Sequence, residues 1–207
     1  MKLVLAAVYV ATYDDVQSSQ TKQGVELIRQ YRDKTRVESG NSGVEVLQEI
    51  GRPNRFVIVE YWKDQAAFDA HEKGDATTQF RSRLKAIHNS PYDQRVHQAL
   101  AADSRGLRVP GGTVSEVTHV DVPPPRREET EVLLKRLAED SKKDAGGLHY
   151  DVFQEMTRTN HFTIFGTLKD RASFDAHEAL AHTRQFRESL APLLGAPSDE
   201  RLYAPVQ

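Results

Sequence analysis

The stretch AAFDAHEKGDATTQFRSRL at residues 66–84 returns as ASFDAHEALAHTRQFRESL at residues 172–190, 106 residues further along a chain of 207. The similarity extends beyond this stretch. Residues 43–97 align with residues 149–203 without a gap, and 23 of the 55 pairs are identical. Self-similarity over such a length indicates a duplicated domain, and each copy is long enough to bury a core of its own.

The repeat predicts two domains and a short connection. We expect the first domain at residues 1–100 and the second at residues 113–207. Between them, residues 101–112 form the expected linker, because their Gly, Pro and charged residues interrupt the apolar periodicity.

Within each copy the periodicity predicts the order β-α-β-β-α-β, which is the ferredoxin-like arrangement of an α+β fold. Asp64 and Asp170 stand where N-caps belong, each before a short helix. The elements expected in the first copy are strands at 3–12, 43–50, 55–62 and 93–100, and helices at 19–36, at 65–72 and from Gly74 to about residue 87.

The strands are too apolar for a sheet with one face in water. FVIVEYW at residues 56–62 is apolar almost throughout, and FTIFGTL at residues 162–168 places Phe165 at a position expected to face solvent. Both faces are therefore expected to be covered. The simplest cover is the sheet of the other copy, which predicts a barrel of the dimeric α+β type within one chain. Further association of this intramolecular pseudo-dimer stays open.

Composition excludes several classes of partner and site. Lys and Arg number 28 against 30 Asp and Glu, without long blocks of one sign, so we expect no nucleic-acid or membrane partner. The absence of cysteine excludes disulfides, thiolate nucleophiles and Cys-ligated metals. The N-terminal run MKLVLAAVYVA is too short to span a bilayer and is expected to be a strand, and the expected location is the cytoplasm.

The first copy resembles the antibiotic biosynthesis monooxygenase (ABM) family, including its quinol monooxygenase type, in the succession FVIVEYWKD, AAFDAH and TTQFRSRL. The segment HEALAHTRQF of the second copy resembles the family pattern more closely still. The resemblance covers both copies and implies two tandem ABM domains whose sheets build a shared barrel. It also implies an oxidoreductase that oxygenates a small aromatic phenol or hydroquinone with O₂ as a cofactor-independent monooxygenase, without metal or flavin.

The residues permit that chemistry. His71 and His177 titrate in the range of a general base, and Glu60 is a charge inside an apolar strand. The remaining candidates are expected to bind substrate: aromatic rings at Tyr61 and Trp62, positive charges at Arg81 and Arg187, and a replacement base at His182.

Each candidate also has a structural interpretation. His71 can cap the last turn of its helix, Trp62 can fill core, and the two arginines can be solvated. The segment HEALAH resembles a zinc motif but separates its histidines by five positions, about 140° on a continuous helix, so we expect no metal site.

The two copies differ at the candidate site. The first copy combines Glu60, Tyr61 and Trp62 with His71, whereas the second has Gly166, Thr167 and Leu168 beside His177. We therefore expect chemistry in the first copy, and a role for the second copy stays open. The alternative is a non-catalytic barrel that binds a small hydrophobic ligand in a stress or regulatory role.

Overall fold

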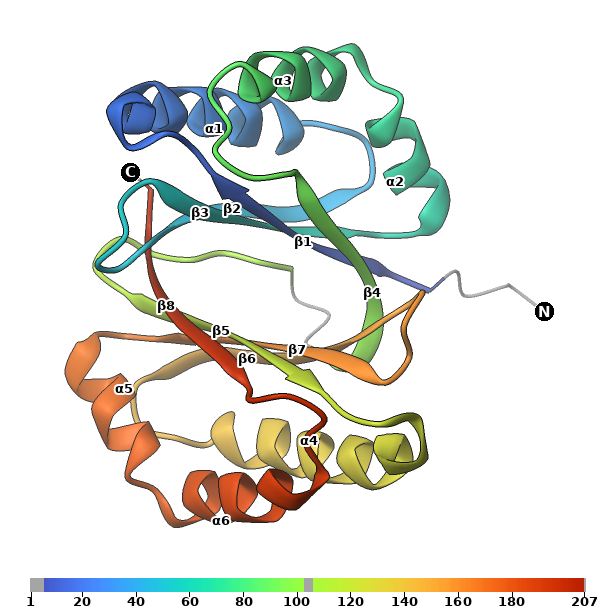
Figure 1. Ribbon diagram of the computed structural model, residues 1–207, viewed down its shortest axis with the longest axis vertical. Coiled ribbons are helices and arrows are strands. Elements are labelled where there is room, and N and C mark those ends of the chain that lie inside the picture. Colours follow the sequence, from blue (N-terminus) through green and yellow to red (C-terminus); the bar gives the residue numbers. More distant parts are fainter. Residues whose placement is uncertain (1–5, 103–105, 207) are drawn as a thin grey trace. The chain divides into compact units, whose positions relative to one another are not determined.

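The computed structural model describes residues 6–102 and 106–206 and shows the same succession of elements twice (Figure 1). The start of the predicted strand 3–12 lies outside the described residues, because residues 1–5 are not described. Residues 103–105 of the predicted linker lie outside them as well. The first copy contains β1 Val8–Asp15, α1 Thr21–Thr35, β2 Asn41–Glu49, β3 Arg55–Trp62, α2 Gln65–Glu72, α3 Asp75–Lys85 and β4 Asp93–Ala101.

The second copy repeats this order, with 3-10 turns before α4 and after α6. Its elements are β5 Val114–Asp121, α4 Arg127–Ser141, β6 Gly147–Glu155, β7 His161–Leu168, α5 Arg171–Glu178, α6 Ala181–Leu190 and β8 Asp199–Pro205. The two tandem ferredoxin-like domains predicted from the sequence are thereby confirmed.

Local sequence explains where the short helices begin and end. The Asp64 carboxylate accepts a hydrogen bond from the backbone N–H of Ala67 at 2.8 Å, and Asp170 accepts one from Ser173 at 2.8 Å. Both predicted N-caps are therefore confirmed. Extended backbone at Gly74 and at Leu180 separates each short helix from the longer helix that follows.

The chain divides into two compact units that exchange strand ends. Unit 1 contains the described residues up to Val96, a short stretch ending at Val109 and the end of the chain from Ala204. Unit 2 contains the rest, including the end of β4 from His97. The hydrogen-bonded strand order, β1-β3-β2-β8-β5-β7-β6-β4, closes into the predicted antiparallel barrel.

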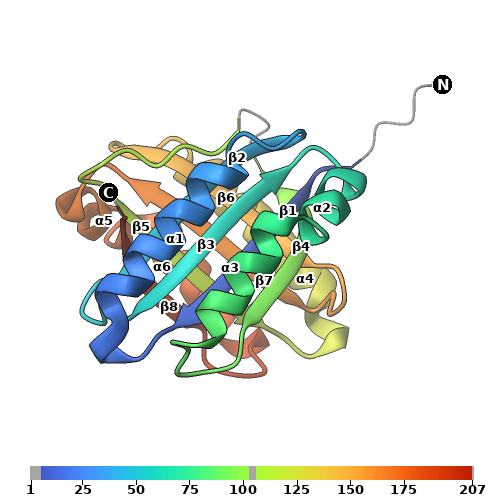
Figure 2. The same ribbon diagram turned by 90° about the horizontal axis from the view of Figure 1, so that it is seen from above.

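In unit 1 the helices α1 and α3 lie across β3 (Figure 2). Alternate residues of β3 face these helices, and Phe56 and Ile58 pack with Leu27, Ile28 and Phe80 in one apolar core. The residues between them, such as Val57 and Val59, are also buried, as is Phe165 of β7 in unit 2. The prediction that both sheet faces are covered is confirmed.

No helix in the part of the chain that the structure describes has the length and apolar character needed to span a bilayer.

Candidate functional site

The histidine of unit 1 lies in a buried hydrogen-bonded cluster. His71 stands in the last turn of α2, and its Nδ1 lies 2.9 Å from Oε2 of Glu38. Its Nε2 lies 2.8 Å from the hydroxyl oxygen of Tyr31, which comes from α1. The Trp62 ring lies beside the imidazole, with ring centroids 4.6 Å apart. Both imidazole nitrogens are therefore engaged by protein groups.

Glu60 completes this cluster from strand β3. Its side chain is fully buried, and its Oε1 accepts a hydrogen bond of 2.9 Å from the Tyr31 hydroxyl. Burial raises the pKa of Glu60 to about 7, against a lowering influence of the nearby His71. Tyr31 also stacks on Phe80 at 4.1 Å between ring centroids. The Tyr31 hydroxyl therefore bonds both His71 Nε2 and Glu60 Oε1, which lie 3.6 Å apart.

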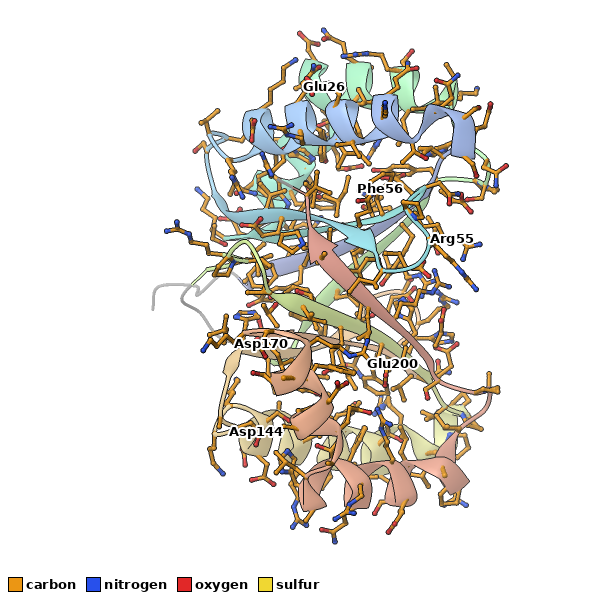
Figure 3. All side chains as sticks on the ribbon, turned by 90° about the vertical axis from the view of Figure 1, so that its left-hand side faces the viewer. Glu26, Arg55, Phe56, Asp144, Asp170 and Glu200 are labelled. Atoms are coloured by element: carbon orange, nitrogen blue, oxygen red, sulfur yellow. The ribbon has the colours of Figure 1, made fainter. Side chains whose placement is uncertain are left out.

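In unit 2 the equivalent histidine keeps its carboxylate partner and loses its tyrosine. His177 Nδ1 lies 2.7 Å from Oδ2 of Asp144, and Asp144 is the repeat equivalent of Glu38. Figure 3 shows Asp144 after α4, on the helix side of its sheet. The equivalents of Tyr31 and Glu60 are Leu137 and Gly166.

The missing carboxylate and ring are supplied by neighbouring strands. Glu116 of β5 and Tyr150 of β6 both pair in register with Gly166 of β7. A Cβ atom at position 166 would lie 2.6 Å from Glu116 Oε1 and 3.0 Å from Tyr150 Cδ2. The absence of a side chain at Gly166 therefore makes room for the two side chains.

Glu116 is the most perturbed carboxyl group of this region. Burial raises its pKa to about 8, and a hydrogen bond from the Tyr150 hydroxyl lowers it in part. Its Oε1 is buried and has no hydrogen-bond partner. The group is mainly protonated at neutral pH and can donate a hydrogen bond to a ligand.

A hollow of about 380 Å³, part of it open to solvent, adjoins these groups. Arg187 of α6 pairs with Glu178 of α5 and with Glu200 of β8 at the same place. Figure 3 shows Glu200 on its strand. The side chains that line the hollow include Glu116, Leu137, Tyr150, His177, Glu178, Arg187 and Glu200. The hollow therefore joins an imidazole, a protonated carboxyl group and a guanidinium.

Two segments of the chain, residues 7–83 and residues 113–189, match the family described as antibiotic biosynthesis monooxygenase. The chain belongs to this family. YcnE of Bacillus subtilis, a candidate monooxygenase by its name, is 31% identical over 81 residues, which are 39% of this chain and 85% of YcnE.

At least three solved structures resemble the whole ABM chain, among them the following two. One is FN1347 of Fusobacterium nucleatum, also a candidate monooxygenase by its name, with a TM-score of 0.89, 18% identity, and coverage of 99% of this chain and 94% of FN1347. The other, named an anthrone oxidase-like protein, has a TM-score of 0.73, 11% identity, and coverage of 98% of this chain and 92% of its own. At these identities the likeness shows the fold alone.

Not all candidate residues of this ABM chain come together. Tyr61 points to the sheet face opposite Glu60 and contacts Tyr9, with ring centroids 4.8 Å apart. It is therefore not part of the His71 cluster. Trp62 does contact His71 and is fully buried, and its indole Nε1 has no hydrogen-bond partner.

The two arginines are held by carboxylates and are not simply solvated. Arg81 pairs with Glu72 and lies 5.0 Å above the Tyr92 ring. Arg187 has the equivalent partner Glu178 and borders the hollow.

Two interpretations of the second copy were wrong. Its carboxylate is not lost, because Glu116 replaces it from another strand. The only sequence signal for Glu116 is its charge within the otherwise strand-like TVSEVTHV.

The expectation that His177 and His182 lie about 140° apart on one continuous helix is also wrong, because α5 ends at Glu178 and α6 begins at Ala181. His182 consequently turns back, and its Nε2 lies 3.2 Å from Asp144 Oδ2.

Proposed function

We propose that this chain is a monooxygenase that oxidises a small phenol, hydroquinone or anthrone-type aromatic with O₂ in the hollow of unit 2. The observation that carries the proposal is the replacement of Tyr31 by Leu137, which leaves His177 at the edge of a hollow. Membership of the ABM family supports the reaction class.

His177 is the proposed general base. With its Nδ1–H donated to Asp144, its Nε2 carries a lone pair. In the repeat, the equivalent nitrogen of His71 faces the Tyr31 hydroxyl, so Nε2 of His177 is expected to face the substrate. A positioned base of this kind contributes about 10²- to 10⁴-fold to a rate.

Glu116 and Arg187 are the proposed oxyanion partners. The protonated Glu116 carboxyl can donate a hydrogen bond to the oxygen of a phenolate or enolate, and the Arg187 guanidinium adds fixed positive charge. Because both Glu178 and Glu200 pair with Arg187, the guanidinium charge is balanced by carboxylates and the site favours a neutral aromatic substrate.

The substrate itself supplies the electrons in this proposal. Deprotonation gives an electron-rich anion that reduces O₂. When a ring CH₂ becomes C=O, the substrate loses four electrons, one oxygen atom enters the carbonyl and the other leaves as water. No metal or flavin is needed for this balance.

Oxygen uptake with a panel of hydroquinones and anthrones tests the proposal. His177→Ala should lower turnover about 10²- to 10⁴-fold. The matched His71→Ala variant should keep the rate within about threefold and lower the melting temperature, because Tyr31 and Glu38 lose their hydrogen bonds to the imidazole. No turnover by the wild type, with saturable binding of the same aromatics, would assign the chain to the non-catalytic alternative. Loss of turnover only in His71→Ala would place the chemistry in unit 1, as the sequence suggested.

A further inference from the structure

The side of His177 that faces away from the hollow carries a second group of donor atoms. Asp144 Oδ2 lies 2.7 Å from His177 Nδ1 and 3.2 Å from His182 Nε2. The three donor atoms all lie within 4.8 Å of one another. The loop after α4, the last turn of α5 and the first turn of α6 each supply one of them.

We propose that Asp144, His177 and His182 bind a divalent first-row transition metal of the Zn²⁺ type. Two imidazoles and one carboxylate are a donor set that such ions favour. In a tetrahedral site with bonds of about 2.0–2.2 Å, ligand atoms lie roughly 3.3 Å apart. The distance of 2.7 Å between Asp144 Oδ2 and His177 Nδ1 therefore has to widen by roughly 0.6 Å to admit the ion.

The donor atoms are enclosed on one side and accessible on the other. The side chains of His177 and Asp144 are 2% and 9% exposed, whereas His182 is 22% exposed. His182 Nε2 is a buried atom without a hydrogen-bond partner, in spite of its distance from Asp144. His182 also lines a surface hollow together with Asp140 and Gln185, so the partly exposed imidazole is the side from which an ion would enter.

Unit 1 provides an internal control for this group. There the equivalent positions are Glu38, His71 and Ala76, so the histidine–carboxylate pair is present and the third donor is missing. In unit 1 the protein groups around His71 engage both imidazole nitrogens, whereas unit 2 places a second imidazole beside the same carboxylate. Three protein ligands are also the minimum usual for an accessible zinc site, so only unit 2 is expected to bind the ion.

Cobalt titration of the chelator-treated full chain tests the site. Co²⁺ should bind with a stoichiometry of one per chain, give the visible absorption of a four-coordinate ion and be displaced by Zn²⁺. His182→Ala and Asp144→Asn should each weaken binding at least about 10-fold, since loss even of a supporting partner of a ligand typically costs 10- to 100-fold. The matched His71→Ala variant should leave affinity and stoichiometry unchanged.

Folding of the variants is checked by thermal unfolding without metal. Since His182 is partly exposed, His182→Ala should melt close to the wild type. Absence of Co²⁺ and Zn²⁺ binding at millimolar metal, or equal binding by the wild type and folded His182→Ala, would overturn the proposal.

Metal binding should also affect turnover, and this consequence rests on the proposed function. An ion on Nδ1 forces the proton of a neutral imidazole onto Nε2, the nitrogen that must accept a proton from the substrate. Zn²⁺ should therefore inhibit the wild type, with at least 10-fold weaker inhibition of any activity that His182→Ala retains. Metal binding without inhibition would leave the site in place and contradict the assignment of His177 as the base.

Discussion

The two histidines stand on equivalent helices and keep equivalent carboxylate partners, yet one is enclosed and the other borders a hollow. In unit 1, the Tyr31 hydroxyl bonds both His71 and Glu60, so each of these buried groups has a protein partner. In unit 2, Leu137 cannot make these bonds, and the carboxyl group comes from Glu116 on another strand. The comparison teaches that a duplicated backbone can hold a closed hydrogen-bonded cluster in one copy and a hollow at the equivalent place in the other.

The largest effect is expected from giving unit 2 the tyrosine that stands at the equivalent position, Tyr31, in unit 1. Leu137→Tyr should place a hydroxyl near His177 and Glu116 and lower turnover by about 10²-fold or more, because the base is then occupied. The measurement is oxygen uptake with the substrate found active in the panel.

Tyr31→Leu is the reciprocal variant. It should destabilise the protein by about 1–3 kcal/mol, because it leaves the buried carboxyl group of Glu60 unsatisfied. Full activity of folded Leu137→Tyr would show that the hollow of unit 2 is not the site.

A smaller effect is expected from filling the gap at Gly166. The Cβ of Gly166→Ala would lie 2.6 Å from Glu116 Oε1 and push that side chain toward the hollow. We expect turnover to fall about 10-fold and stability to fall by about 1–3 kcal/mol. Combining it with Glu116→Ala should recover stability but not turnover. If the double variant melts no higher than Gly166→Ala, the contact with Glu116 is not the cause.

The dependence of stability on pH distinguishes the two buried carboxyl groups. Burial raises the pKa of Glu60 to about 7 and that of Glu116 to about 8, from an ordinary value of 4.5. Because the folded state then binds more protons than the unfolded state, stability should fall as pH rises from 4.5 through these values.

Denaturant unfolding between pH 5 and pH 9 measures this dependence. Glu60→Gln should remove the part of the decline that ends near pH 7, and Glu116→Gln the part that ends near pH 8. Retention of the whole decline in both variants would contradict the raised pKa values.

The sequence by itself determined the repeat, the element order, the capped short helices and the burial of both sheet faces. Each of these depends on local periodicity or on neighbouring residues, as with Asp64 and Asp170, whose side chains cap the helices that directly follow them. Duplication strengthened these predictions, because the same pattern had to explain both copies.

Only the tertiary structure decided which side chains share a site. Strand register places Glu116 and Tyr150 beside Gly166, although 50 residues separate Glu116 from the glycine in the sequence. Strand alternation turns Tyr61 away from Glu60, and the break between α5 and α6 brings His182 to Asp144. A site is made where strands and helices distant in sequence meet, and a cavity depends on the volume of every side chain around it, so local patterns do not specify either one.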